Sequence, residues 1–428
     1  MEIFLNYDKA QLSVTLPDEL DVSIIRKPEM PLLDDPVAVL EAAFAAPDGG
    51  PPLADLAAGA TTACILICDI TRPVPNGLFM QPLLRALLAA GLEKRGITIL
   101  VATGLHRPNV EDELAELVGD SWVMENFRVE NHIARDDAAH VSLGQTRSGT
   151  VVKLDKRFVN ADLRIATGLV EPHFMAGWSG GRKVIAPGVA HAETITTFHS
   201  ARFMEHPGCA NCILDGNPLH EEQLEIMAML GGAQALNVVI DEARRISMIN
   251  FGEVVESHMA AVDHVHAYAE VGVPERFPTV VTSAAGYPLD KTYYQTVKGM
   301  VGPLDILEPG GSLVVASACS EGMGSAEYVA SQRRLIEIGA EQFLRDIEAK
   351  SHASVDEWQT EMLLKPLRAG RVGLYTDGLS QEELALTGVT QIASVAAAVA
   401  EAVAAAGDNR VAIIPEGPYV VPRYRPQS

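Results

Sequence analysis

Three short apolar runs in the first half of the chain leave few folds open to it. The runs are residues 61–68 (TTACILIC), 96–103 (GITILVAT) and 161–168 (ADLRIATG). Short, continuous apolar runs predict buried strands. Helical patterns at 77–91 and 111–118 lie between them. Buried strands that alternate with helices are typical of a parallel sheet in an α/β domain.

The polar residues that follow these runs are expected to meet in space. Asp69 and Arg72 follow the first run, His106 follows the second, and Glu171 and His173 follow the third. The carboxyl ends of parallel strands share one edge of the sheet, and ligands bind beyond that edge. The sequence therefore predicts one assembled site built from three strand ends.

Residues 168–190 (GLVEPHFMAGWSGGRKVIAPGVA) form the most unusual stretch of the chain. Glycine clusters cost backbone entropy and tend to occur where the chain bends sharply or approaches a ligand. Lys183, directly after such a cluster, is a candidate for a covalent or phosphate-contacting lysine. Neither GxxxxGK[ST] nor GxGxxG is present, so the ordinary nucleotide-binding loops are excluded.

A second α/β pattern follows residue 272. Its expected strands are 279–288, 310–319, 371–377 and 410–417, with helical patterns between them. We therefore expect two α/β domains with mainly parallel sheets and an active site in the cleft between the domains. The expected domains are residues 1–272 and 273–409, with residues 410–428 able to pack back on the first domain.

Charge and composition narrow the class of protein. With 33 Lys and Arg against 56 Asp and Glu, the formal net charge is -23, which argues against nucleic acid and against an anionic membrane surface. No window holds about 18 uninterrupted apolar residues, and the first residues lack the basic region of a signal peptide. Five cysteines are too few and too uneven for a disulfide framework. These features predict a cytoplasmic enzyme.

Each candidate residue also has a purely structural interpretation. Asp69 could cap the following helix and pair with Arg72, and spacing alone leaves the two interpretations equal. A single histidine is more often structural than catalytic, but His106 and His173 are both expected at the same edge of the sheet. Lys183 could be a surface lysine at a helix start, which its apolar and glycine neighbours disfavour.

The remaining polar motifs are weaker. Cys209 and Cys212 form a C-x-x-C pair, but no second pair accompanies it, and a structural loop is favoured. Gln295 and Lys298 share a face of a predicted helix that could face the first domain or the solvent. His199 lies in a predicted helix without the HExxH spacing of an ordinary zinc site.

Taken in order, five motifs resemble the nickel-dependent lactate racemase family, which includes other 2-hydroxyacid racemases and epimerases. The motifs are DITRP (69–73), GLHR (104–107), EPHFMAGWSGGRK (171–183), the histidine after TITTF (His199) and YQTVKG (294–299).

The resemblance implies a nickel-pincer nucleotide, Ni(II)-pyridinium-3,5-bisthiocarboxylate mononucleotide, made by separate cofactor-biosynthesis enzymes. Lys183 matches the lysine that holds this cofactor covalently, and His199 matches the protein ligand of nickel. The cofactor supplies the other metal ligands, and soft sulfur together with imidazole suits nickel. Gly180 and Gly181 are then expected to let the backbone turn close to the planar cofactor.

The resemblance also assigns the remaining residues. His106 and His173 match two acid/base histidines, one for each enantiomer. Four residues match positions that contact the cofactor or the substrate carboxylate: Asp69, Arg72, Gln295 and Lys298. The implied reaction is racemisation or epimerisation of a 2-hydroxyacid, either lactate or a related or larger acid. Hydride is removed from C2 and returned through a 2-keto acid intermediate.

Two other functions remain open from the sequence. One is a non-catalytic binding protein for a hydroxyacid or a sugar acid. The other is a conventional metal-dependent hydrolase or lyase in which His106 and His173 are metal ligands.

Overall fold

The computed structural model describes residues 1–426, which form two compact α/β units. The central unit consists of Glu29–Phe198 and Ile213–Ala267. The terminal unit contains both ends of the chain and consists of Met1–Pro28, His199–Cys212 and Tyr268–Ser428. Each unit is built on a six-stranded sheet with mainly parallel strands, which confirms the expected fold class.

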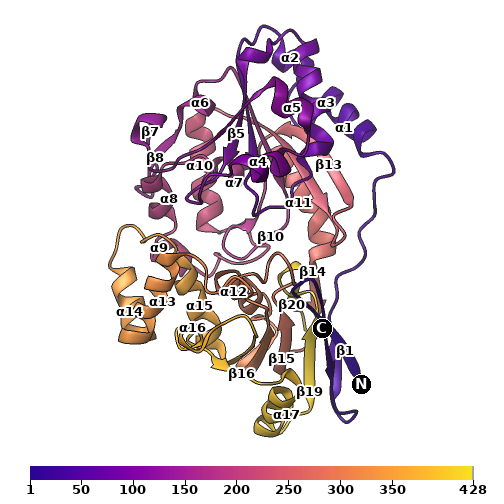
Figure 1. Ribbon diagram of the computed structural model, residues 1–428, viewed down its shortest axis with the longest axis vertical. Helices are drawn as coiled ribbons and strands as arrows, with labels where there is room; N and C mark the ends of the chain where they lie inside the picture. Colours follow the sequence, from indigo (N-terminus) through magenta and orange to yellow (C-terminus); the bar gives the residue numbers. More distant parts are fainter. Residues whose placement is uncertain (427–428) are drawn as a thin grey trace. The chain divides into compact units, whose positions relative to one another are not determined.

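The sheet of the central unit has five parallel strands and one antiparallel edge strand (Figure 1). Its order is β13 (Ile246–Glu253), β12 (Gln234–Ile240), β9 (Leu163–Leu169), β4 (Ala63–Cys68), β5 (Ile97–Ala102) and β6 (Arg128–Asn131). The three apolar runs of the sequence correspond to β4, β5 and β9. Their continuous apolar character follows from burial on both faces of the sheet.

Helices cover both faces of this sheet. One face packs against α1 (Pro36–Ala45), α2 (Leu53–Ala57), α3 (Asn76–Ala89), α4 (Glu111–Val118) and α5 (Ser121–Asn126). Ile65 and Ile67 of β4 point to that face. Because successive side chains of a strand alternate, Cys68 points to the other face. There lie α6 (Lys156–Val159), α7 (Arg182–Ile185) and α10 (Pro218–Leu230).

The sheet of the terminal unit is entirely parallel. Its order is β18 (Thr390–Gln391), β17 (Arg371–Tyr375), β16 (Leu307–Ala316), β15 (Phe277–Ser283), β19 (Arg410–Ile414) and β3 (Asp21–Ile24). An apolar core joins the sheet to α17 (Val395–Ala406) and to the hairpin of β1 (Glu2–Tyr7) and β2 (Ala10–Thr15). Helices α12 (Tyr293–Val301) and α15 (Glu357–Ala369) also pack against its strands.

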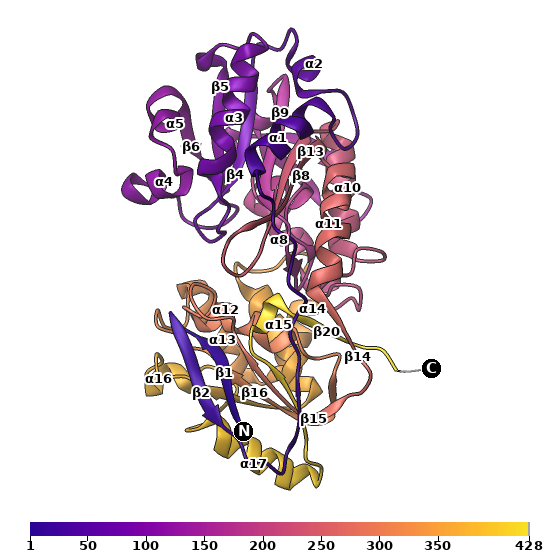
Figure 2. The same cartoon turned by 90° about the vertical axis from the view of Figure 1, so that its right-hand side faces the viewer.

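The units divide the chain at positions other than 272 and 409. Residues from the start of the chain form β3, which pairs with β19, so both ends of the chain contribute to the terminal sheet. Figure 2 shows the N-terminal hairpin of β1 and β2 in the same unit as β15 and β16. The last strand, β20 (Val421–Tyr424), pairs with β14 (Glu270–Val273) in the same unit. Residues 410–426 thus belong with the second α/β pattern and not with the first, and the last two residues of the expected segment lie outside the described residues. The sequence cannot reveal these pairings, because the partner strands lie hundreds of residues apart.

Among residues 1–426, no helix combines the length and the apolar character needed to cross a bilayer.

A buried polar network fixes the carboxyl edge of the central sheet. Asp155 is fully buried at the end of β8 (Val151–Asp155) and accepts hydrogen bonds from Nε and Nη2 of Arg157 at 2.9 and 2.6 Å. It also lies 3.2 Å from Nδ1 of His132, whose Nε2 lies 3.0 Å from the carbonyl oxygen of Ala190. Burial alone would raise the pKa of Asp155, but the bonds from Arg157 and His132 outweigh it and hold that pKa well below its usual range.

We predict that Asp155→Ala lowers the free energy of unfolding by about 3 kcal/mol, since it leaves partly buried Arg157 without its closest carboxylate. The matched control is Glu93→Ala, which breaks an exposed pair with Arg95 and should change stability by less than about 0.5 kcal/mol. Urea unfolding at neutral pH measures both values.

Wild type and Asp155→Ala together also test how the contribution of Asp155 to stability depends on pH. The folded pKa of Asp155 is depressed, so its contribution is present above the unfolded pKa of about 3.9. It is lost as the pH falls through the folded value. The difference between wild type and Asp155→Ala should therefore shrink on acidification, and a difference that stays constant with pH would contradict the network.

Candidate active site

The candidate site lies where the strand order of the central sheet reverses. The chain passes from β4 to β5 and then to β6 on one side, and β9 returns on the other side of β4. The carboxyl ends of β4 and β9 therefore flank the switch point at which parallel α/β sheets bind ligands. Asp69 follows β4 directly, and Glu171 follows β9 by two residues.

Asp69 and His106 form a close pair across the ends of β4 and β5. Oδ2 of Asp69 lies 2.5 Å from Nδ1 of His106. Oδ1 accepts hydrogen bonds from the amide of Thr71 at 3.2 Å and from its hydroxyl at 2.5 Å, which fixes the turn after β4. The side chain of Asp69 is 7% exposed and that of His106 is 52% exposed. The pair is thus anchored at the acid and open at the imidazole.

The charge of Asp69 determines which ring nitrogen of His106 carries the proton. Burial alone would raise the pKa of Asp69, but the hydrogen bonds from His106 and Thr71 and the charge of Arg72 outweigh it, and the pKa is lowered. An ionised carboxylate only accepts hydrogen bonds, so Nδ1 of His106 carries the proton. In the neutral ring Nε2 then has the free lone pair and can accept a proton.

In His173 the two ring nitrogens have the opposite roles, because Nδ1 accepts hydrogen bonds and Nε2 carries the proton. It lies in a two-residue strand, β10 (Pro172–His173), which pairs with β11 (Gly177–Trp178) in a miniature hairpin. The amides of Met175 and Ala176 donate to its Nδ1 at 3.3 and 3.2 Å. Because these amides can only donate, the proton of the neutral ring lies on Nε2. His106 therefore presents an acceptor and His173 a donor.

Lys183 lies in the first turn of α7, against the ends of β4 and β9. Its side chain is partly buried. Among residues 1–426 its amine has no hydrogen-bond or ion-pair partner. Burial lowers the pKa of Lys183 to about 7, and the nearby charge of Arg72 acts in the same direction. A substantial fraction of this amine is thus neutral and nucleophilic at neutral pH.

Arg72 and Cys68 complete the surroundings of Lys183. Nε of Arg72 lies 3.9 Å from Oε1 of Glu171, so the charges at the two strand ends partly balance. Burial raises the pKa of the Cys68 thiol to about 11, which keeps this neighbour neutral. The thiol is 3.7 Å from the carbonyl oxygen of Thr167.

The structure shows a packing role for two glycines of the stretch. A Cβ at Gly181 would lie 2.7 Å from the side chain of His258, and one at Gly180 would lie 2.7 Å from Val170. Both glycines have a positive φ, +46° and +78°. Gly180 is thus required for close packing against the end of β9, and Gly181 for close packing against His258. The expected approach of this backbone to a cofactor stays a prediction.

The sequence did not reveal the buried residues that bind the main chain of residues 176–182. Arg182 is fully buried, and its Nη1 lies 3.2 Å from Nδ1 of His258, whose Nε2 donates to the carbonyl oxygen of Ser179 at 2.8 Å. Its Nη2 donates to the carbonyl oxygen of Ala176 at 3.3 Å. Nothing in the spacing pairs residue 182 with residue 258.

Three predicted site residues belong to the terminal unit. His199 lies between α8 (Ala192–Phe198) and α9 (Ala201–Met204), and its ring centroid is 4.9 Å from that of Trp358 on α15. The helix predicted around His199 is thus broken at that residue. Gln295 and Lys298 lie on the partly exposed face of α12, and the side chains of Tyr293 and Val297 are buried behind them. Trp358 had no signal in the sequence.

The residues present fit a covalently held cofactor. Lys183 offers a partly neutral amine with no partner among the described residues. In residues 1–426, no group of three or more His, Cys, Asp or Glu side chains is placed to hold a metal ion. Cys209 and Cys212 are free, and burial raises the pKa of each thiol to about 12.

Comparison with known proteins identifies the family. A family model of the lactate racemase N-terminal domain matches residues 7–211, and a model of the lactate racemase C-terminal domain matches residues 275–421. A lactate racemase of Thermoanaerobacterium thermosaccharolyticum is 30% identical over 98% of this chain and 99% of that protein. One of Lactiplantibacillus plantarum is 34% identical over 66% of each chain.

Solved structures agree with this result. The lactate racemase apoprotein of T. thermosaccharolyticum matches with a TM-score of 0.91 over 99% of this chain and all of that one, at 30% identity. A Thermotoga maritima protein matches with a TM-score of 0.66 and 16% identity over 87% of this chain and 96% of that one, and shares the fold. The resemblance inferred from the five motifs is confirmed, and with it the expected class of enzyme. The chain belongs to the lactate racemase family, whose members are isomerases.

Proposed function

We propose that the chain racemises or epimerises a short 2-hydroxyacid, with lactate as the first candidate, using a nickel-pincer nucleotide bound covalently to Lys183. The observation that carries the proposal is the environment of Lys183. A partly buried lysine at the switch point of the sheet, with its pKa lowered to about 7, suits covalent attachment of a ligand and does not suit a solvated surface role. Family membership supports the substrate class.

The other candidate residues have complementary roles. Arg72, at the end of β4, and Lys298, on α12, are cations that suit the carboxylate of the substrate or the anionic groups of the cofactor. Gln295 shares the face of Lys298 and adds a hydrogen-bonding amide. His199 is the proposed protein ligand of nickel, and its ring packs against Trp358, which limits its rotation. When bound, the cofactor supplies the centre that takes hydride from C2 of the substrate and returns it.

The two histidines manage the hydroxyl proton. As hydride leaves C2, the hydroxyl must lose its proton, and Nε2 of His106 is the available acceptor. Asp69 then stabilises the imidazolium through Nδ1. Nε2–H of His173 donates a hydrogen bond to the oxygen of the 2-keto acid. When hydride returns to C2, the imidazolium of His106 gives its Nε2 proton back to that oxygen, so both rings end in their starting states.

Attachment at Lys183 is tested by intact mass. Wild-type protein that is coexpressed with the cofactor-making enzymes should carry a mass shift, and peptide mapping should place it on Lys183. Lys183→Arg keeps a positive charge but has no nucleophilic amine, and it should lack both the adduct and the activity. Active protein with an unmodified Lys183 would refute the proposed cofactor.

The reactivity of Lys183 in the apoprotein should follow its lowered pKa. Acylation by an excess of a small activated ester should rise with pH through a midpoint near 7. Arg72→Met removes a positive charge that disfavours the ammonium form, so the midpoint should move to higher pH. Quantitative peptide mass spectrometry measures both profiles. Lys94, exposed on the same unit, is the internal control and should show no such shift on substitution of Arg72.

The Asp69–His106 pair is tested by kinetics. His106→Gln should lower kcat/KM by about 10²- to 10⁴-fold, the usual contribution of a general base. Asp69→Asn leaves a group of the same shape but removes the charge that fixes the tautomer, and should cost about 10²-fold or more. Both variants should keep the mass adduct on Lys183.

The symmetry of the reaction sharpens this test. The two enantiomers of lactate have equal free energies, so kcat/KM must fall equally in both directions in every variant, whereas kcat and KM can change separately. Chiral chromatography from each pure enantiomer measures the four constants. Retention of full activity by Asp69→Asn would remove His106 from its proposed role.

A further inference from the structure

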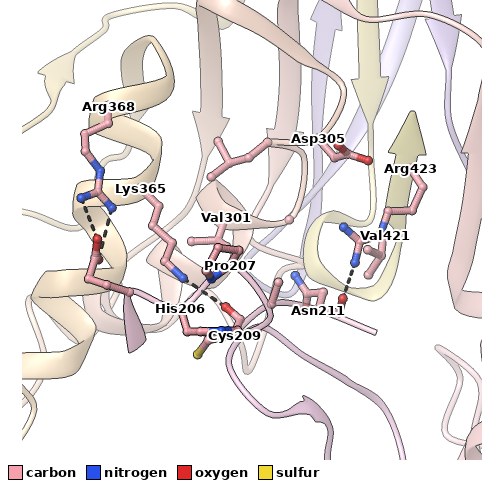
Figure 3. Close-up of a pocket in the computed structure, with 14 residues that line it drawn as sticks. His206, Pro207, Cys209, Asn211, Val301, Asp305, Lys365, Arg368, Val421 and Arg423 are labelled. Atoms are coloured by element: carbon pink, nitrogen blue, oxygen red, sulfur yellow. Dashed lines mark hydrogen bonds and ion pairs between the residues drawn. The ribbon is translucent and has the colours of Figure 1, made fainter. Parts of the chain in front are cut away.

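A pocket lies within the terminal unit and is formed by parts of the chain without a role in the proposed reaction (Figure 3). Its volume is about 250 Å³. Its walls come from residues 205–211, from the chain at the end of α12, from α15 and from β20. We call residues His199–Cys212 the crossing segment, because they belong to the terminal unit while the chain on both sides belongs to the central unit.

Most of the charged side chains in the pocket are already neutralised. Nη1 and Nη2 of Arg368 donate to the two carboxylate oxygens of Glu205 at 2.8 and 3.2 Å. Nε of Arg423 lies 3.4 Å from Oε2 of Glu270, a carboxylate that also pairs with Arg425. Lys365 differs from both, because within residues 1–426 its Nζ donates only to the carbonyl oxygen of Cys209, at 3.0 Å (Figure 3).

The nearest carboxyl groups do not offset the charge of Lys365. Glu361, one helical turn before it on α15, is 1% exposed, and burial raises its pKa to about 9, so it is neutral at pH 7. Asp305 lines the pocket but lies 3.6 Å from Nη2 of Arg276 and accepts from the amide of Tyr424 at 2.9 Å. The lining itself has three cations, Lys365, Arg368 and Arg423, against two carboxylates, Glu205 and Asp305, so it carries one net positive charge.

The remaining lining supplies a second donor and an apolar wall. Nδ1 of His206 accepts from the amide of Gly208 at 3.1 Å, so the proton of the neutral ring lies on Nε2. Val301, Leu304 and Val421 contribute apolar surface. One cation, one neutral donor and an apolar wall suit a small monoanion with an apolar body. They suit a doubly charged oxyanion poorly.

We propose that this pocket binds a short-chain monocarboxylate, with its carboxylate against Nζ of Lys365 and its apolar body against Leu304 and Val421. Such a ligand would also restrain the crossing segment. That segment contacts one face of α15 through His199 with Trp358, Cys209 with Lys365, and Glu205 with Arg368. A bound acid would thus tie the residues after the proposed nickel ligand more firmly to α15.

Titration calorimetry of the full-length apoprotein with propionate tests the site. Propionate has no 2-hydroxyl group and cannot be a substrate. Lys365→Met keeps the aliphatic stem but removes the charge, and should weaken the binding at least tenfold. The matched control, Arg333→Met, removes an exposed charge from α13 (Ala326–Ile338) of the same unit and should leave binding unchanged. Propionate at the proposed substrate site would persist in Lys365→Met, so only the component that depends on Lys365 counts.

Two further measurements make the outcome unambiguous. Leu304→Trp fills the pocket without changing its charge and should also abolish this component, which guards against misfolding of Lys365→Met. Hydrogen exchange of residues 205–211 should slow on addition of propionate in wild type and in neither pocket variant. Binding that is unaffected by both substitutions would overturn the proposal. Inorganic phosphate that binds as tightly as propionate, with the same dependence on Lys365, would overturn the assignment to carboxylates.

Discussion

The close approach of α7 to the ends of β4 and β9 is the constraint on which the candidate site depends. It depends on Gly168 and Gly180, because a Cβ on Gly168 would lie 2.7 Å from the side chain of Val184 and one on Gly180 would lie 2.7 Å from that of Val170. The approach takes Lys183 out of water and brings it near Arg72, and these two effects lower its pKa. A lysine on a looser loop would be an ordinary ammonium ion with little nucleophilic character. Packing between backbone segments thus determines the chemistry of one amine.

The two histidines show how the backbone can set proton states without any difference in residue type. A buried carboxylate holds the proton of His106 on Nδ1, whereas two main-chain amides hold that of His173 on Nε2. In the proposed reaction the two rings therefore have different parts: Nε2 of His106 accepts a proton, whereas Nε2–H of His173 donates a hydrogen bond.

Much of this arrangement could be predicted from the sequence, because it depends on local patterns. The apolar runs at 61–68, 96–103 and 161–168 are typical of buried strands. The rule that ligands bind at the carboxyl edge of a parallel sheet then predicts that Asp69 and His106 lie close together. The motifs from DITRP to YQTVKG identified the family. The contacts between distant segments could not be predicted. Arg182 with His258 and His199 with Trp358 join positions that share no periodicity, and the tautomers depend on which atoms lie within 3.3 Å of each ring.

The pairing of β3 with β19 has a consequence for the synthesis of the chain. Asp21 and Arg410 are neighbours in the folded sheet, although almost the whole chain separates them. On the ribosome, the first strands emerge long before their partners exist, while all strands of the central sheet have been made by residue 253. The central sheet can therefore form first, while β3 has no partner strand until residues 410–414 of β19 have been made. Contacts of such long range slow folding, so the N-terminal hairpin is where this enzyme should depend most on chaperones during its synthesis.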